Sequence, residues 1–240
     1  MHINEIREEH QNYMKHKILR RYAVFLTGIL FMGLGIALTA KSDLGTSPIS
    51  SIPYVCSVIF PWTFGQFTVA YNVLFFLIEY LLLRKDFSRF QFLQLLICPF
   101  FGFFTDLGMH VFAAVAPSLY LAKIGVLLAG TVILAFGIYL QVTANVLINP
   151  GEGLVKAISF RTKIPFGNIK VAFDSTLAII ACAISFTALA YIVGIREGTV
   201  INALLVGLIV KKFHWLAHFI KFEQWLLPKG LIYLKDLKQN

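Results

Sequence analysis

The sequence predicts an all-α, polytopic membrane protein with about six transmembrane helices, arranged as a 3+3 inverted repeat with two short re-entrant half-helices. The first observation is composition: hydrophobic residues occupy 58% of the 240 positions, charged residues occupy 14%, and the mean hydropathy is +0.76. Soluble domains carry roughly a quarter charged residues, so this chain belongs to the membrane class. The second observation is length, since six apolar stretches each approach the roughly 20 residues that a helix needs to cross a bilayer. These stretches lie near residues 21–40, 65–83, 91–115, 119–141, 167–192 and 199–218.

The third observation is an internal repeat, in which one pattern occurs twice without a gap. Gly35 corresponds to Gly137, which sets the spacing at 137 − 35 = 102 residues. Ten identical pairs share this spacing, whereas unrelated sequences of ordinary composition would share about three. The first members of the pairs are Gly28, Gly35, Ile36, Leu38, Pro48, Ser57, Phe64, Gly65, Val69 and Ala70. The pattern therefore indicates a duplicated structural unit.

Positive charge at the ends of the apolar stretches indicates how they cross the membrane. With a cytoplasmic N-terminus, most Lys and Arg residues fall on the inner side, and the external connections hold only Lys41, Lys123 and Arg196. Three spans in each copy then require the second copy to enter the membrane from the opposite side. The predicted divisions are a cytoplasmic lead (1–19), a first membrane repeat (20–116), a second membrane repeat (117–218) and a cytoplasmic interfacial tail (219–240).

Two further apolar segments, 48–60 and 150–160, are too short to cross the bilayer, and a proline begins each of them. A polar residue precedes each proline as a candidate N-cap, and proline suits the first helical position because it has no N–H to leave unpaired. Glu152 follows its cap at the spacing of a capping box. The residues that begin these predicted half-helices are Ser47 and Pro48 in the first copy, and Asn149, Pro150, Gly151 and Glu152 in the second.

The two half-helix starts predict a solute site. Unpaired N–H groups and the positive end of the helix dipole attract anions at a helix N-terminus. Helix breaks that recur in both copies are typical of transporters with discontinuous helices. The alternative is that proline and glycine only make tight interfacial turns.

Ionisable or strongly polar side chains at membrane depth are costly, so each is a candidate for function. Asp43 and Asn145 are equivalent positions before the two half-helices, and Asn72 and Asp174 are equivalent positions inside two spans. We expect them to line or couple the site. The alternatives are that Asp43 is solvated in the external headgroup region and that Asp174 is a hydrogen-bonded structural residue.

Three other charged positions have competing interpretations. Arg196 offers a guanidinium for a carboxylate or phosphate, or else forms a plain loop ion pair with Glu197. Asp106 lies late in the third span, where it either lines a pore or sits near the outer surface. Glu79 falls five residues before Arg84 near the inner surface. Snorkelling or a local ion pair accounts for Glu79 better than chemistry does.

Small residues predict one close helix contact. Gly28 and Gly35, like Gly130 and Gly137, are seven residues apart, so each pair lies on one helix face two turns apart. Glycine lets two helices approach closely. We therefore expect the first and fourth spans to pack together.

Composition and motifs exclude several other functions. The net charge of +9 sits in short clusters beside apolar runs, which suits lipid headgroups better than nucleic acid. Cys56, Cys98 and Cys182 show no metal-ligand spacing, so we expect no metal and no other cofactor. No zinc-protease or serine-hydrolase motif occurs, so we expect no catalytic residues and no enzymatic activity. Aromatic and basic residues over 211–227 suit a helix at the inner interface, in contact with anionic lipids.

Four motifs, taken together, carry a family resemblance. They are Gly33 to Leu38 (GLGIAL), Asp43 to Pro48 (DLGTSP), Asn149 to Leu154 (NPGEGL) and Arg196 to Thr199 (REGT). In this order they resemble the YczE/YyaS/YitT group of bacterial integral membrane proteins over nearly all of residues 20–212. The resemblance implies a bacterial inner-membrane protein with a transport role, and it implies no particular substrate.

The expected function is transport of a small, anionic solute by a secondary carrier or exporter that works by alternating access. The expected site residues are Asp43, Ser47, Pro48, Asn72, Asn145, Asn149, Pro150, Gly151, Glu152, Asp174 and Arg196. Two alternatives stay open: a channel in which the half-helices form a filter, and a membrane scaffold or assembly factor without a transported ligand. The expected partners are the lipid bilayer and the solute, and the oligomeric state is left open, a homo-oligomer included.

Overall fold

The computed structural model describes residues 2–219, with side chains described for residues 19–217. All regular structure in that part of the chain is helical. Six of its helical segments are long and apolar enough to cross a membrane, and each matches one predicted stretch. These segments are Leu19–Lys41, Phe64–Asp86, Arg89–Val111, Tyr120–Ala144, Phe166–Leu189 and Glu197–Ala217. The predicted all-α, polytopic class is therefore confirmed.

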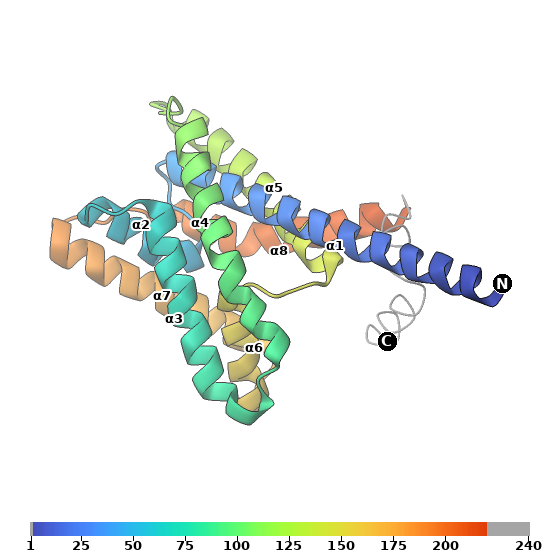
Figure 1. The fold of residues 1–240 in the computed structure, drawn as a ribbon. Coiled ribbons are helices and arrows are strands. Elements are labelled where there is room, and N and C mark those ends of the chain that lie inside the picture. Colours follow the sequence, from blue (N-terminus) through green and yellow to red (C-terminus); the bar gives the residue numbers. More distant parts are fainter. Residues whose placement is uncertain (1, 220–240) are drawn as a thin grey trace.

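The helices follow one another along the chain as Figure 1 labels them. They are α1 (His2–Lys41), α2 (Pro48–Ile59), α3 (Phe64–Leu83), the 3₁₀ turns η1 (Arg84–Asp86) and η2 (Arg89–Phe92), α4 (Leu93–Val111), α5 (Tyr120–Ala144), α6 (Pro150–Thr162), α7 (Phe166–Leu189) and α8 (Glu197–Phe219). The short helices α2 and α6 each begin at the proline that the sequence predicts. The predicted lead continues into the first span as one helix, and residues 220–240 of the predicted tail lie outside the described residues.

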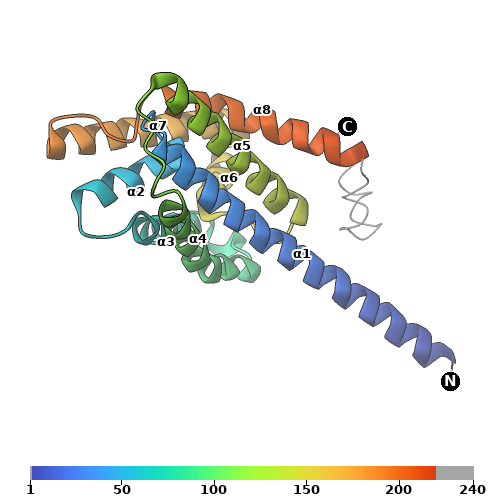
Figure 2. The same ribbon diagram turned by 90° about the horizontal axis from the view of Figure 1, so that it is seen from above.

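Helices α1 and α5 run side by side in both views (Figures 1 and 2). Glycine permits this approach: a Cβ added at Gly35 would lie 2.4 Å from the Leu134 nitrogen, and one added at Gly137 would lie 2.5 Å from the Met32 nitrogen. Any larger side chain would force the two backbones apart. The predicted close packing of the first and fourth spans through their glycines is confirmed.

Helix contacts recur between the two copies. Helix α2 packs on α7 as α6 packs on α3, α2 packs on α3 as α6 packs on α7, and α1 packs on α4 as α5 packs on α8. One pair differs, because α3 packs on α4 whereas α7 and α8 make little contact within the described part of the chain. The inversion of the second copy relative to the membrane stays a prediction.

Helix α7 ends earlier than the predicted limit at residue 192. Ala190 takes a left-handed conformation with φ of 61°, which stops the helix after Leu189. Ser185 Oγ then donates to the Tyr191 carbonyl at 2.8 Å and accepts from the Val193 N–H at 2.8 Å. These bonds turn the chain back, and no glycine or proline at residues 190–192 marks the turn in the sequence.

Candidate functional site

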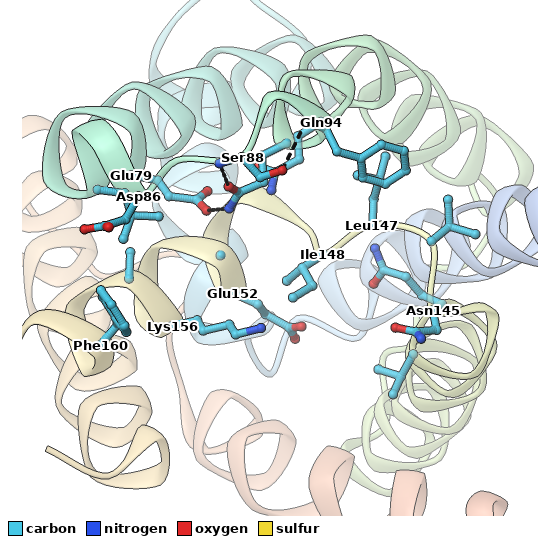
Figure 3. Close-up of a pocket in the computed structure, with 18 of the residues that line it drawn as sticks. Glu79, Asp86, Ser88, Gln94, Asn145, Leu147, Ile148, Glu152, Lys156 and Phe160 are labelled. Carbon is cyan, nitrogen blue, oxygen red and sulfur yellow. Dashed lines mark hydrogen bonds between the residues drawn. The ribbon is translucent and has the colours of Figure 1, made fainter. Parts of the chain in front are cut away.

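A cavity of about 660 Å³ lies at the start of α6, between α3, α4, α5 and α6 (Figure 3). Its lining runs from the buried side chains of Glu79 and Gln94 to the exposed Asp86 and Lys156, so it opens to the surface. A volume of this size accommodates a drug-sized ligand. The polar lining residues are Glu79, Asp86, Ser88, Gln91, Gln94, Gln141, Asn145, Glu152 and Lys156.

Glu79 is the most deeply buried ionisable group on this cavity, with 1% of the residue exposed. Its Oε1 accepts a hydrogen bond of 2.7 Å from Gln91 Nε2, while its Oε2 has no hydrogen-bond partner among the described residues. Gly153 of α6 makes room for the carboxylate, because a Cβ added there would lie 2.6 Å from Glu79 Oε2. The predicted snorkelling or surface ion pair is therefore wrong: this face of α3 packs on α6 instead of meeting headgroups.

Gln91 is held in place by the turn that contains it. Residues 88–91 form a capping box, in which the Ser88 N–H donates to Gln91 Oε1 at 2.7 Å. The amide nitrogen of Gln91 is thereby directed at Glu79. Gln94 follows on α4 with 2% of the residue exposed, and its Oε1 also lacks a partner in the described part of the chain.

Helix α6 contributes a carboxylate and an ammonium group. Glu152 and Lys156 lie one turn apart on α6, and both side chains extend into the cavity (Figure 3). Asn149 is the N-cap and Pro150 begins the helix, as predicted, but no side-chain capping bond forms. The predicted capping box is wrong because the Glu152 side chain turns to the cavity and not back to Asn149.

Asp86 at the rim has its own partner. Its Oδ2 lies 3.0 Å from Arg161 Nη2. Arg161 also donates to the carbonyls of Leu82 and Leu83 at 2.9 and 2.8 Å, which caps the C-terminus of α3. The charge of Asp86 is therefore compensated within the protein.

The start of α2 is closed, in contrast to the start of α6. The Thr46 N–H donates to the Gly194 carbonyl at 3.0 Å, and the Gly198 N–H donates to the Leu44 carbonyl at 2.8 Å. Gly45 has a φ of +108°, and a Cβ added there would lie 2.4 Å from Thr199 Oγ1. The segment before α2 is thus pinned against the start of α8 with no space between them.

Charged residues surround this closed start at the surface. Asp43 has 71% of its side chain exposed and pairs with Lys123 of α5. Arg196 donates from Nη1 to the Asp43 carbonyl at 3.2 Å and pairs with Glu197 at 3.3 Å. Asp43 and Arg196 therefore lie together, but away from the cavity.

The remaining predicted residues fall into separate places. Asn145 and Glu152 line the cavity, while Asn149, Pro150 and Gly151 form the adjacent first turn of α6. Ser47 caps α2 by position only, because its hydroxyl donates to Ser50 Oγ at 3.0 Å and makes no capping bond. Pro48 follows it as the first residue of α2.

Asn72 and Asp174 make local contacts on their own helices. Asn72 is buried and donates to the Thr68 carbonyl at 2.8 Å. Asp174 Oδ1 lies 2.8 Å from Nζ of Lys170, which is one turn earlier on α7. Asp106, for which two interpretations were open, accepts from Thr63 Oγ1 at 2.6 Å and from the Gly65 N–H at 2.7 Å, so it caps the start of α3.

The two half-helix starts touch each other. A Cβ added at Gly151 would lie 2.3 Å from Ile49 Cδ1. These residues are equivalent in the repeat, since 151 − 49 = 102. The first turns of α2 and α6 therefore meet at one shared point, with the cavity on the α6 side of it. No group of three or more His, Cys, Asp or Glu side chains within the described residues is arranged to hold a metal ion.

Comparison with known proteins identifies the family. Residues 19–215 match a family model described as "Family of unknown function (DUF6198)". The chain belongs to this family. It is also 26% identical, over 199 residues, to the "Uncharacterized membrane protein YczE" of Bacillus subtilis (strain 168), with 82% of this chain and 87% of that protein covered. The match confirms the YczE-like resemblance, and the relative's description as a membrane protein agrees with the six span-length apolar helices found among the described residues. No solved structure matches the chain.

Proposed function

We propose that this protein is a secondary carrier or exporter, and that a small polar solute occupies the cavity at the start of α6. The observation that carries the proposal is a difference between two equivalent positions. Thr46 is 0% exposed, whereas Ile148 is 39% exposed and lines the cavity. Since 148 − 46 = 102, both residues occupy the same point of the repeat. Alternating access follows if the two copies exchange these arrangements.

Equivalent basic residues support a shared construction of the two starts. Lys123 of α5 pairs with Asp43, while Arg21 of α1 donates to the Asn145 carbonyl and, at 2.9 Å, to the Ala144 carbonyl. Arg21 and Lys123 are equivalent because 123 − 21 = 102, as are Asp43 and Asn145. The closed and open starts therefore differ mainly in their contacts with α8 and α4, and those are the helices that we expect to move.

The proposed setting is a bacterial inner membrane with both termini in the cytoplasm, which places the cavity on the cytoplasmic side. Basic residues at that side would contact anionic lipids. A half-helix start alone would favour an anion, as the sequence predicts. However, three carboxylates and one ammonium group line the cavity, so we propose a polar solute that is not an anion. No chemical reaction is part of this function.

Cysteine accessibility tests the proposal without knowledge of the solute. Thr46→Cys and Ile148→Cys would each be made in a chain whose own three cysteines are replaced by alanine. Modification by a membrane-impermeant maleimide would be measured from each face of proteoliposomes. We expect Ile148→Cys to react rapidly from one face and Thr46→Cys to react slowly from the other. The matched control is Ala135→Cys, which is equally buried at 0% but lies on α5, a helix that we do not expect to move, and it should not react.

Each other result of this experiment contradicts a carrier. A chain in which Thr46→Cys reacts from neither face is static, as a scaffold or assembly factor would be. A chain in which both positions react from both faces, together with an ionic current, is a channel.

A further inference from the structure

We infer that the solute carries an ammonium group on an apolar body and that Glu79 binds this ammonium group. The inference rests on the proposed function, because it takes the cavity as the solute site. It adds the sign of the solute's charge and the residue that recognises it.

Unpaired acceptors inside the cavity provide the first argument. Glu79 Oε2 and Gln94 Oε1 are both buried, and neither has a hydrogen-bond partner among the residues described. A buried carboxylate without a partner is costly at membrane depth. An ammonium group carries three N–H donors and a positive charge, so it supplies the donor that Glu79 Oε2 lacks.

The neighbouring charges provide the second argument. Asp86 is compensated by Arg161 at 3.0 Å. Glu152 is attracted by Lys170 of α7, which itself pairs with Asp174 at 2.8 Å. Gln91 and Gln94, which approach Glu79 from η2 and α4, carry no charge. Lys156 attracts Glu79 across the cavity, but no cation of the described residues forms an ion pair or a hydrogen bond with Glu79.

The repeat provides a third argument, because the carboxylate occurs in one copy only. The position equivalent to Glu79 is Ala181, since 181 − 79 = 102, and it is 0% exposed. Ala181 shows that helix packing at this point of the repeat does not require a carboxylate. The burial of a carboxylate at position 79 therefore needs a reason other than packing, and a bound cation supplies one.

Apolar lining residues define the rest of the solute. Phe90, Val146, Ile148 and Phe160 form much of the remaining wall, and the volume is about 660 Å³. A metal ion alone would leave these apolar side chains without any contact. An organic amine fills it with hydrocarbon, and its ammonium group lies at Glu79.

Three probes of matched shape test the assignment by equilibrium dialysis against the detergent-purified full chain. They are 2-(1-naphthyl)ethylamine, 1-naphthaleneethanol and 1-naphthylacetate, which carry a cation, a neutral hydroxyl and an anion. We expect the amine to bind at least about tenfold more tightly than either analogue, as a charge-assisted hydrogen bond implies. Glu79→Gln should remove about that tenfold preference and leave the binding of the alcohol unchanged. Glu197→Gln, a matched substitution outside the cavity, should change neither.

Two results would overturn the inference: naphthylacetate binding as tightly as the amine, or Glu79→Gln keeping the full amine preference. The comparison of probes on the unmodified chain stands even if Glu79→Gln does not fold. The binding experiment and the cysteine experiment can fail independently of each other. A chain that alternates in the cysteine experiment but prefers the carboxylate is a carrier for another class of solute. A chain that binds the amine while Thr46→Cys stays unreactive is an amine-binding protein without alternating access.

Discussion

The starts of α2 and α6 occupy equivalent positions at the spacing of 102 residues, yet one is sealed and the other borders a cavity. At the sealed start, Gly45 and Gly198 allow the loop before α2 to pack directly on α8. At the spacing of 102, their counterparts are Leu147 and Leu96, and Leu96 is 66% exposed on α4. Glycine thus occupies both positions at the sealed start and leucine occupies both at the open start, so we expect side-chain volume there to influence which start is closed.

Gly45→Ala should break this comparison most strongly. Its φ of +108° disfavours a side chain, and the added Cβ would lie 2.4 Å from Thr199 Oγ1. We expect a loss of about 3 kcal/mol in the free energy of unfolding, from backbone strain and overpacking together. Thermal unfolding of the purified protein measures it, with Gly125→Ala as the control, because a Cβ added at Gly125 meets no atom within 4 Å. Unchanged stability would show that the glycine is not needed for the seal.

Gly198→Ala should have a smaller effect on the same seal. Its Cβ would lie 2.6 Å from the Leu44 carbonyl oxygen, but its φ is not in the left-handed region, so only the close contact is strained. We expect about 1–2 kcal/mol of destabilisation and a faster reaction of Thr46→Cys with the maleimide. Equal labelling of Thr46→Cys with and without Gly198→Ala would mean that α8 does not cover this start.

Lys123→Met should have the smallest effect and should sharpen the comparison. The Asp43 side of this ion pair is solvated, since 71% of the Asp43 side chain is exposed, against 20% for Lys123. We expect a loss of at most about 1 kcal/mol, which disappears at high salt because dissolved ions screen an ion pair at the surface. Unfolding temperatures at low and high salt measure it. A large loss that persists in salt would make this ion pair, and not the glycine contact, the principal closure.

The positions of the helices can be predicted from the sequence because hydropathy and proline affect helix formation within a few neighbouring residues. The six spans and both half-helices were predicted within a few residues, and the close contact at Gly35 and Gly137 followed from the repeat. Glycine spacing reports helix packing directly, since only glycine permits backbones to touch.

The candidate site was only partly accessible from the sequence. Asn145 and Glu152 were predicted and do line the cavity, but Asp43 and Arg196 lie at the sealed surface. Glu79 was assigned to the headgroup region because it lies near Arg84 in sequence. Its replacement by Ala181 in the second copy was the available signal that the charge is not required by the fold.

The sequence by itself determined the class of the protein, its duplicated plan and the places where its helices begin. Those properties depend on composition, period and helix-start chemistry, which are read along the chain. Only the tertiary structure decided that one start is closed by Gly198 and that Glu79 is buried beside Gln91 and Gly153. Burial and closure depend on groups far apart in sequence, so only the folded chain shows which carboxylate is removed from water.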